Sequence, residues 1–216
     1  MAEQVKATRR YDSPRRREQA AATRREILDA AQALFERDGY AATTMAAIAK
    51  EARVALKTVY LAFETKSGLL RALWHLLLRG DEEDTPVPQR QWYLEVLNEP
   101  DPERALRMGA RGSTIVKRRI GGILEVIRGG AATDPEVAAL WARIQDELYA
   151  NQLAIVERIA ARGALRDGLD ADRAADILWT LIHPGIWQCL VVERGWTPEQ
   201  HEEWLAETSC AQLLGR

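Results

Sequence analysis

The sequence predicts an all-α protein in which an N-terminal three-helix unit of the helix-turn-helix type precedes a larger helical body. Apolar residues recur at steps of three and four positions along most of the chain, and few segments alternate as strands do. Residues that start or stop helices flank these stretches. The chain has 216 residues, 47% of them hydrophobic, which is enough to bury a core.

The chain begins with a segment that lacks an apolar stripe. Residues 1–22 hold two arginine clusters among Pro, Ser, Gln and Ala, so we expect a flexible basic arm there. From Thr23 the apolar positions follow helical spacing. Gly39 is expected to close this first helix in the left-handed conformation.

Two short apolar-periodic segments follow. Thr43 or Thr44 is expected to cap the first of them, and a turn at Arg53 leads to a second helix over residues 56–63. Helices of this length are marginal in water when isolated. They must therefore pack against each other and the first helix, which leaves one face of the second helix free for an outside partner.

The charges are distributed unevenly along the chain. Residues 1–80 carry 15 Lys and Arg against 9 Asp and Glu, whereas residues 81–216 carry 15 against 23. A basic N-terminal third favours binding to the phosphates of a nucleic acid, as expected of a protein with one nucleic-acid-binding part and one other part. The alternative explanation of the asymmetry is chance, with the charges lying on solvated faces.

Residues of about 24–70 resemble the DNA-binding domain of the TetR family of bacterial transcription regulators. The resemblance rests on Ile27, Ala30, Phe35, Gly39, Thr43, Thr44, Ile48, Ala49, the stretch VALKTVYLAF, Lys66, Leu69 and Leu70. Two positions depart from the family pattern, because Arg53 stands where the turn usually has Gly and Ala55 where Ser is frequent. An arginine there implies a strained turn.

The resemblance also implies roles for individual side chains. The positions that usually contact phosphate are Thr44, Thr58, Tyr60 and Lys66, and those that approach bases are Met45, Leu56, Lys57 and Ala62. Lys57 has the length to reach guanine, and Leu56 and Ala62 can pack on thymine methyl groups. Since three of the four base-approaching side chains form no hydrogen bonds, we expect apolar contact and DNA shape to supply much of the discrimination. The arm either adds DNA contacts or is a solubilising tail.

The remaining chain is expected to be helical, and we assign residues 23–70 to a DNA-binding domain and 71–216 to a ligand-binding and dimerisation domain. A helix containing Trp74 connects the two, and the polar loop GDEEDTPVPQR follows it. One further helix is expected from residue 102 or 103 to 128, although its glycines can interrupt it, and another from a cap at Asp134 to Gly163. A third is expected from a cap at Asp172 through ILWTLIHPGIWQCLVV, with a kink at Pro184. The last is expected to begin with a capping box at Thr197.

The last two helices are apolar enough to need a partner surface. The resemblance implies that they pair with their copies in a homodimer, which sets two recognition helices over a pseudo-palindromic operator in double-stranded DNA. The alternative is that they only complete the core of one subunit.

The body is also expected to hold an effector pocket. By resemblance, the residues near it are Trp92, Trp141, Trp179, His183 and Trp187, with Arg118 or Arg119 meeting the polar end of a flat or apolar ligand. Each tryptophan by itself is more often core. The kink beside His183 either lines the pocket or fits the dimer helices together. The helix around Trp74 would carry the effector response to the DNA-binding domain, and repression is the default by resemblance.

Other classes of protein find little support. The three histidines are far apart, and the sequence has no HExxH, CxxC, P-loop or nucleophile-elbow motif, so we expect no catalytic site, metal or cofactor. We see no leading apolar segment and no apolar run near 18 residues, which predicts a cytoplasmic protein with free thiols and no membrane contact. The alternative function is a ligand-binding or scaffold protein of the same fold that binds DNA little.

Overall fold

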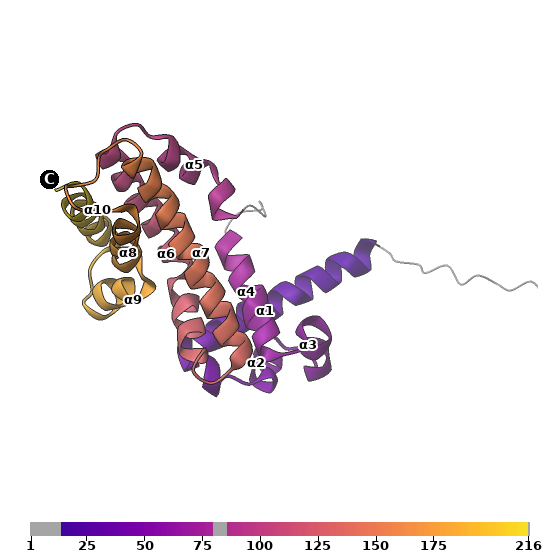
Figure 1. Cartoon of the computed structure of the whole chain (residues 1–216). Helices are drawn as coiled ribbons and strands as arrows, with labels where there is room; N and C mark the ends of the chain where they lie inside the picture. The colour runs from indigo at the N-terminus through magenta and orange to yellow at the C-terminus, as the bar shows by residue number, and fades with distance from the viewer. Residues whose placement is uncertain (1–13, 80–85, 216) are drawn as a thin grey trace, which may run out of the picture.

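The computed structural model describes residues 14–79 and 86–215, and within these ranges the regular elements are all helical (Figure 1). The all-α prediction is confirmed. The elements are α1 (Pro14–Ala42), α2 (Met45–Glu51), α3 (Leu56–Phe63), α4 (Lys66–Arg79), the short 3-10 helix η1 (Val87–Gln89), α5 (Gln91–Asn98), α6 (Pro102–Gly130), α7 (Pro135–Ala160), α8 (Ala171–Ile182), α9 (Pro184–Trp187), the π-helical η2 (Gln188–Glu193) and α10 (Pro198–Leu214).

Helix α1 begins earlier than the sequence analysis predicted. Residues 14–22, which were assigned to the flexible arm, are helical and extend α1 away from the body (Figure 1). This part of the prediction is wrong because the segment is rich in Ala, Arg, Gln and Glu, which favour helix without any packing. The rest of the predicted arm lies outside the described residues. Gly39 breaks the helical conformation with φ of 80° and ψ of 168°, which is a glycine-specific extended conformation and not the left-handed helical one that was expected.

The helix-turn-helix has the predicted local structure. The hydroxyl of Thr44 caps α2 by accepting a hydrogen bond of 3.1 Å from the amide of Ala47. Arg53 adopts φ of 55°, the left-handed conformation that normally favours glycine. Val59 and Phe63 on α3 are buried, so the opposite face of that short helix is left to solvent.

Two hydrophobic cores run along the molecule. The first joins α1–α4 to the C-terminal half of α6 and the N-terminal half of α7, with Phe35, Val59, Leu73, Ile123 and Leu140 among its members. The second joins α5, the other halves of α6 and α7, α8 and α10. Helices α1–α4 therefore share their core with α6 and α7, which run through both halves of the protein.

Helix α6 is continuous over residues 102–130, so its glycines do not interrupt it. Three of them, Gly112, Gly121 and Gly130, instead lie where aromatic rings cross the helix. A Cβ added at Gly112 would lie 2.4 Å from a ring carbon of Trp92, and one added at Gly130 would lie 2.9 Å from the ring of Tyr40. Close packing of these rings therefore offsets the low helix propensity of glycine.

The segment from α8 to η2 differs in two details from the prediction. Asp170, rather than Asp172, caps α8 by accepting a hydrogen bond of 2.8 Å from the amide of Arg173. The expected kink is a complete break: α8 ends at Ile182, and His183 caps a new helix whose first residue is Pro184.

The same segment is more apolar than the sequence analysis allowed. Residues 171–193 are, by length and composition only, sufficient for one membrane span, contrary to the expectation that no such apolar run exists. Within this chain only 28% of the most apolar window is buried. The segment is also interrupted at His183, so it is not one continuous helix.

Candidate DNA-binding surface and effector cavity

Large apolar side chains gather on the outer face of α3. Leu56, Tyr60 and Leu61 are 41%, 47% and 77% exposed, and Lys57 is exposed beside them. A helix that buries Val59 on one side and leaves such side chains in water on the other presents a surface for a partner.

Three of the predicted DNA-contacting residues lie at the edges of this surface. Thr44 is exposed, and Thr58 is half-buried. Ala62 is half-buried too, and its carbonyl oxygen accepts a hydrogen bond of 2.7 Å from Nη1 of Arg24. The guanidinium of Arg24 also lies over the ring of Phe63, 4.1 Å from its centre, and so fastens the end of α3 to α1.

Met45 does not lie on this surface. It is only 7% exposed and packs in the first core, so we remove it from the residues that approach bases. The first position of a short helix is set by the cap before it, and here the Thr44 cap turns Met45 inward.

The ammonium of Lys66 makes hydrogen bonds within the protein. Its ammonium donates hydrogen bonds of 2.8 Å to the carbonyl of Tyr40 and 3.0 Å to the carbonyl of Thr43, and it lies over the ring of Tyr40. Burial lowers the pKa of Lys66. Lys66 thus holds the end of α1 against the start of α4, which differs from the open phosphate contact that the resemblance implied.

The N-terminus of α7 is joined to α1 and α4 by two hydrogen bonds. The hydroxyl of Tyr40 donates to the carboxylate of Asp134, and the hydroxyl of Ser67 donates to that of Glu136, each at 2.5 Å. The bond from Tyr40 is the main reason why the pKa of Asp134 lies below its usual value. The sequence analysis recognised Asp134 only as a helix cap, because a partner 94 positions away gives no local signal.

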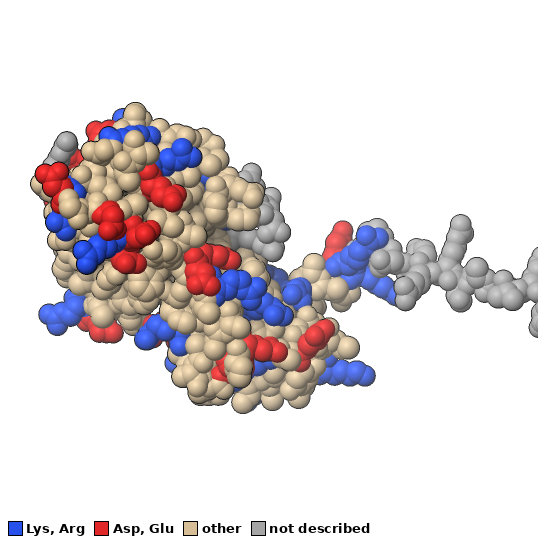
Figure 2. All heavy atoms as spheres, viewed as in Figure 1, with Lys and Arg blue, Asp and Glu red and all other residues tan. Residues whose placement is uncertain are grey.

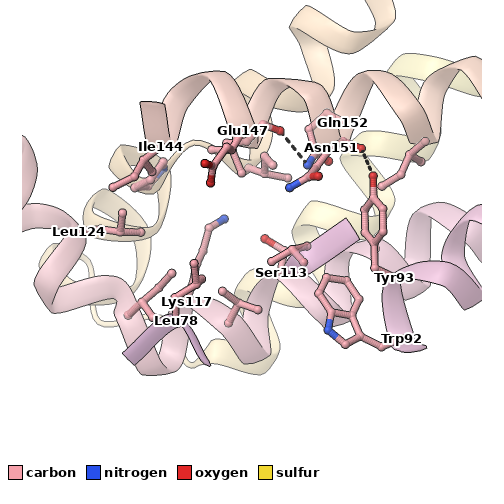
Figure 3. Close-up of a pocket in the computed structure, with 18 of the residues that line it drawn as sticks. Leu78, Trp92, Tyr93, Ser113, Lys117, Leu124, Ile144, Glu147, Asn151 and Gln152 are labelled. Carbon is pink, nitrogen blue, oxygen red and sulfur yellow. Dashed lines mark hydrogen bonds between the residues drawn. The ribbon is translucent and has the colours of Figure 1, made fainter. Parts of the chain in front are cut away.

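A cavity of about 120 Å³ lies between α4, α5, α6 and α7, with two residues from α8 and α9 closing one side (Figure 3). Its wall is mostly apolar. The apolar lining residues are Trp74, Leu78, Val87, Trp92, Tyr93, Gly109, Val116, Ile120, Leu124, Ile144, Leu148, Ile155, Ile182 and Pro184.

A few polar side chains interrupt this apolar wall. Lys117 is 6% exposed, and its ammonium nitrogen has no hydrogen-bond partner among the described residues. Burial lowers the pKa of Lys117 to about 7. Ser113, Glu147 and Asn151 also line the cavity, and the hydroxyl of Tyr93 donates to the carbonyl of Asn151 at 2.6 Å (Figure 3).

Of the five residues predicted to hold a ligand, only Trp92 lines this cavity. His183 packs edge-on against Trp141 and Trp179, with ring centres 6.2 and 5.3 Å apart, and Trp187 packs on His201. The break before Pro184 resets the helical phase, so Trp179 and Trp187 do not share one face.

Neither of the arginines named with these residues lines the cavity. Arg118 pairs with Glu199, and Arg119 donates to the carbonyl of Leu78. The sequence analysis missed Lys117 altogether, since a lysine within a helix usually indicates a solvated face.

Comparison with known proteins identifies the DNA-binding part. Residues 27–73 match the sequence model of the family described as "Bacterial regulatory proteins, tetR family". The chain is also 29% identical over 182 residues to the HTH-type transcriptional regulator TtgR of Pseudomonas putida, and this match covers 78% of this chain and 80% of TtgR. Residues 27–73 therefore belong to the TetR family of regulatory proteins. The similarity to TtgR, which extends over most of the chain, indicates a transcriptional regulator and not an enzyme.

Solved structures share the fold of this chain. NalD of Pseudomonas aeruginosa is 24% identical, with a TM-score of 0.68 over 90% of this chain and 98% of NalD. The SmeT–triclosan complex is 19% identical, with a TM-score of 0.66 over 89% of this chain and 92% of SmeT.

The family match and the cavity occupy different parts of this chain. The matched residues 27–73 include α2, α3 and most of α1. Every residue that lines the cavity lies after position 73. The family match therefore does not extend to the cavity.

Proposed function

We propose that this TetR-family protein is a cytoplasmic repressor that binds a pseudo-palindromic operator as a homodimer and is released by a small, mostly apolar or aromatic effector. The observation that carries the proposal is the exposed apolar face of α3, formed by Leu56, Tyr60 and Leu61. NalD is described as the secondary repressor of a multidrug efflux pump, and SmeT was solved with triclosan, which supports repression and a small effector.

The side chains around α3 suit a DNA groove. Lys57 is placed to donate to a guanine edge, and Leu56, Leu61 and Ala62 offer apolar contact to thymine methyl groups. Thr44, Thr58 and Tyr60 supply hydroxyl groups for phosphate oxygens. Figure 2 shows basic side chains along the projecting N-terminal part of α1, which adds attraction for the DNA backbone.

The outer faces of α8 and α10 support the homodimer. Between them lies a shallow groove of about 320 Å³, lined by Asp176, Ile177, Thr180, Leu181, Thr208 and Gln212. Most of the apolar segment from α8 to η2 is not buried within one chain. A second copy of the chain would cover this surface and set two α3 helices over the two half-sites of an operator.

Two helices connect the proposed effector cavity to the DNA-binding part. Helix α4 lines the cavity through Trp74 and Leu78 and begins next to α3. Helix α7 lines it through Ile144 and Leu148 and is fastened to α1 by Asp134. An effector that prefers a shifted position of these helices would change the spacing of the α3 pair, with a coupling free energy of about 1 to 3 kcal/mol.

The test is binding of the purified protein to the DNA upstream of its own gene, at two salt concentrations and with random DNA as competitor. We expect saturable binding by two subunits per site that weakens as the salt concentration rises. Lys57→Ala should weaken binding, and if Lys57 also contacts a phosphate the salt slope should fall by about 1. Arg143→Ala, which removes an exposed charge from α7, is the control and should bind as the wild type does.

Weak binding that random DNA abolishes, and that Lys57→Ala leaves unchanged, would contradict the repressor proposal. That result would favour a ligand-binding or scaffold protein of the same fold.

A further inference from the structure

We propose that the effector is an amphipathic acid, a molecule with an apolar body that fills the cavity and one carboxylate, or a comparable anionic group, that pairs with the ammonium of Lys117. This inference rests on the proposed use of the cavity as the effector site. It adds the chemical class of the ligand and the residue that selects it.

The position of Lys117 is the first observation. The residue lies in the middle of α6, and its ammonium is buried without a hydrogen-bond partner among the described residues. An isolated buried charge is costly in a protein interior, and an apolar side chain of similar length would be more favourable for folding alone. A lysine kept at such a position is explained if a bound group supplies the missing partner.

The surroundings of Lys117 are the second observation. Figure 3 shows its side chain pointing from α6 into the cavity, toward the side of α7 that carries Glu147 and Asn151. Ser113 lies one turn before Lys117 on the same helix and offers a hydroxyl. The rest of the wall is mostly apolar, so one charged group and a large apolar surface meet in a single cavity. This combination matches a ligand with one charged end and an apolar body.

Glu147 is the competing charge, because its carboxylate favours a cation. Its side chain is exposed to solvent, whereas Lys117 is buried. Water already solvates the carboxylate, so a ligand gains less from pairing with it than from pairing with the buried ammonium. No ion pair within 4 Å joins the two residues in the described part of the chain, so the ammonium remains available to a ligand.

The charge state of Lys117 agrees with this assignment. Its pKa of about 7 means that a bound carboxylate would stabilise the charged ammonium, so binding should take up a proton near neutral pH. Burial lowers the pKa of His183 and lowers that of His201 to about 4, and neither imidazole lines the cavity. Lys117 is therefore the group whose charge responds to the ligand.

The experiment compares three probes that share one apolar body, namely 4-phenylbutyrate, 4-phenylbutyramide and 4-phenylbutylamine. Binding is measured at about pH 6.5, below the pKa of Lys117, by calorimetry and by the fluorescence of the protein, since Trp74 and Trp92 line the cavity. We expect the acid to bind at least about tenfold more tightly than the amide, because a charged hydrogen-bonded pair is stronger than a neutral one.

Two variants test whether Lys117 causes the preference for the acid probe. Lys117→Met keeps the apolar stem and removes the charge, so it should reduce the affinity for the acid to that for the amide and leave the amide unchanged. Glu147→Gln removes the competing carboxylate and should raise the affinity for the acid. Circular dichroism and gel filtration verify that both variants fold.

Three results would overturn the inference. Equal binding of the probes would mean an apolar cavity without charge selection, and tightest binding of the amine, lost in Glu147→Gln, would mean a cation site. Binding of none of the probes would also reject it. Because DNA is absent from this experiment, specific operator binding by the same preparation would show that only the inference has failed. Acid binding without operator binding would reject the repressor proposal instead.

Discussion

The hydroxyl of Tyr40 donates a hydrogen bond of 2.5 Å to the carboxylate of Asp134 and so joins the end of α1 to the first turn of α7. Tyr40 is 4% exposed, and its ring stacks on Phe35 with a centre distance of 5.8 Å. Because α7 continues from this contact to the cavity wall at Ile144, one rigid element links the proposed effector site to the DNA-binding helices.

Tyr40→Phe is expected to lower the free energy of unfolding by about 1 to 2 kcal/mol, because it removes a hydrogen bond to a charged group and keeps the ring. The bond lowers the pKa of Asp134. Its contribution is therefore present above the ordinary value of 3.8 and is lost as the pH falls below it. Urea unfolding at about pH 7 and about pH 3, on either side of that value, measures both effects. Tyr60→Phe, on the exposed face of α3, is the control, and equal stability of Tyr40→Phe and wild type at neutral pH would contradict the prediction.

Arg53→Gly is expected to stabilise the protein by about 1 kcal/mol, because φ of 55° at this position costs energy for any residue with a Cβ. Arg53→Ala is the matched control, since it removes the same charge and keeps the strain. We expect thermal unfolding to show a gain for Gly and a change within about 0.5 kcal/mol for Ala. A similar gain in both variants would attribute the effect to charge instead of backbone strain.

Gly112→Ala is expected to destabilise the protein by about 1 to 3 kcal/mol, because the new methyl group meets the ring of Trp92 at 2.4 Å. Gly129→Ala in the same helix meets nothing within 4 Å and should stabilise by about 0.4 to 1 kcal/mol. Chemical unfolding of the two variants side by side separates helix propensity from packing. Stabilisation by both would show that Trp92 moves aside without cost.

Lys117→Met is expected to raise the free energy of unfolding by about 3 kcal/mol at about pH 6, where the wild type carries an unpaired buried charge. The folded-state pKa of about 7 lies below the ordinary 10.5, so the folded protein binds fewer protons than the unfolded one between these values. The wild type should therefore gain stability relative to the variant as the pH rises from about 7 to 10.5. Urea unfolding across this range tests the trend, with the exposed Lys50→Met as control. If the difference in the free energy of unfolding between wild type and Lys117→Met did not change with pH, Lys117 would not be buried in its charged form.

Prediction from the sequence succeeded where a structure depends on near neighbours. The caps at Thr44, Asp134 and Thr197 each bond to amides two or three positions ahead, so the residue types identify them directly. The bounds of α3 and the left-handed turn at Arg53 are local in the same sense.

The errors share a different cause. The family resemblance implied a role near bases for Met45, but the packing of the first core buries this residue. The glycines of α6 were expected to weaken the helix, but aromatic rings from distant segments make use of them. Trp179, His183 and Trp187 were assigned to a pocket by their nearness to Pro184. Ile182 and Pro184 do line the cavity, but these three side chains do not.

The helical class, the helix-turn-helix and the family resemblance follow from the amino-acid sequence, because periodicity, caps and motif spacing act within a few residues of one another. Three features emerge from the packed chain alone: α6 and α7 run through both cores, Asp134 meets Tyr40, and Lys117 faces a cavity without a partner among the described residues. Burial and pairing depend on side chains far apart in sequence, and the packing of the whole chain sets which of them meet.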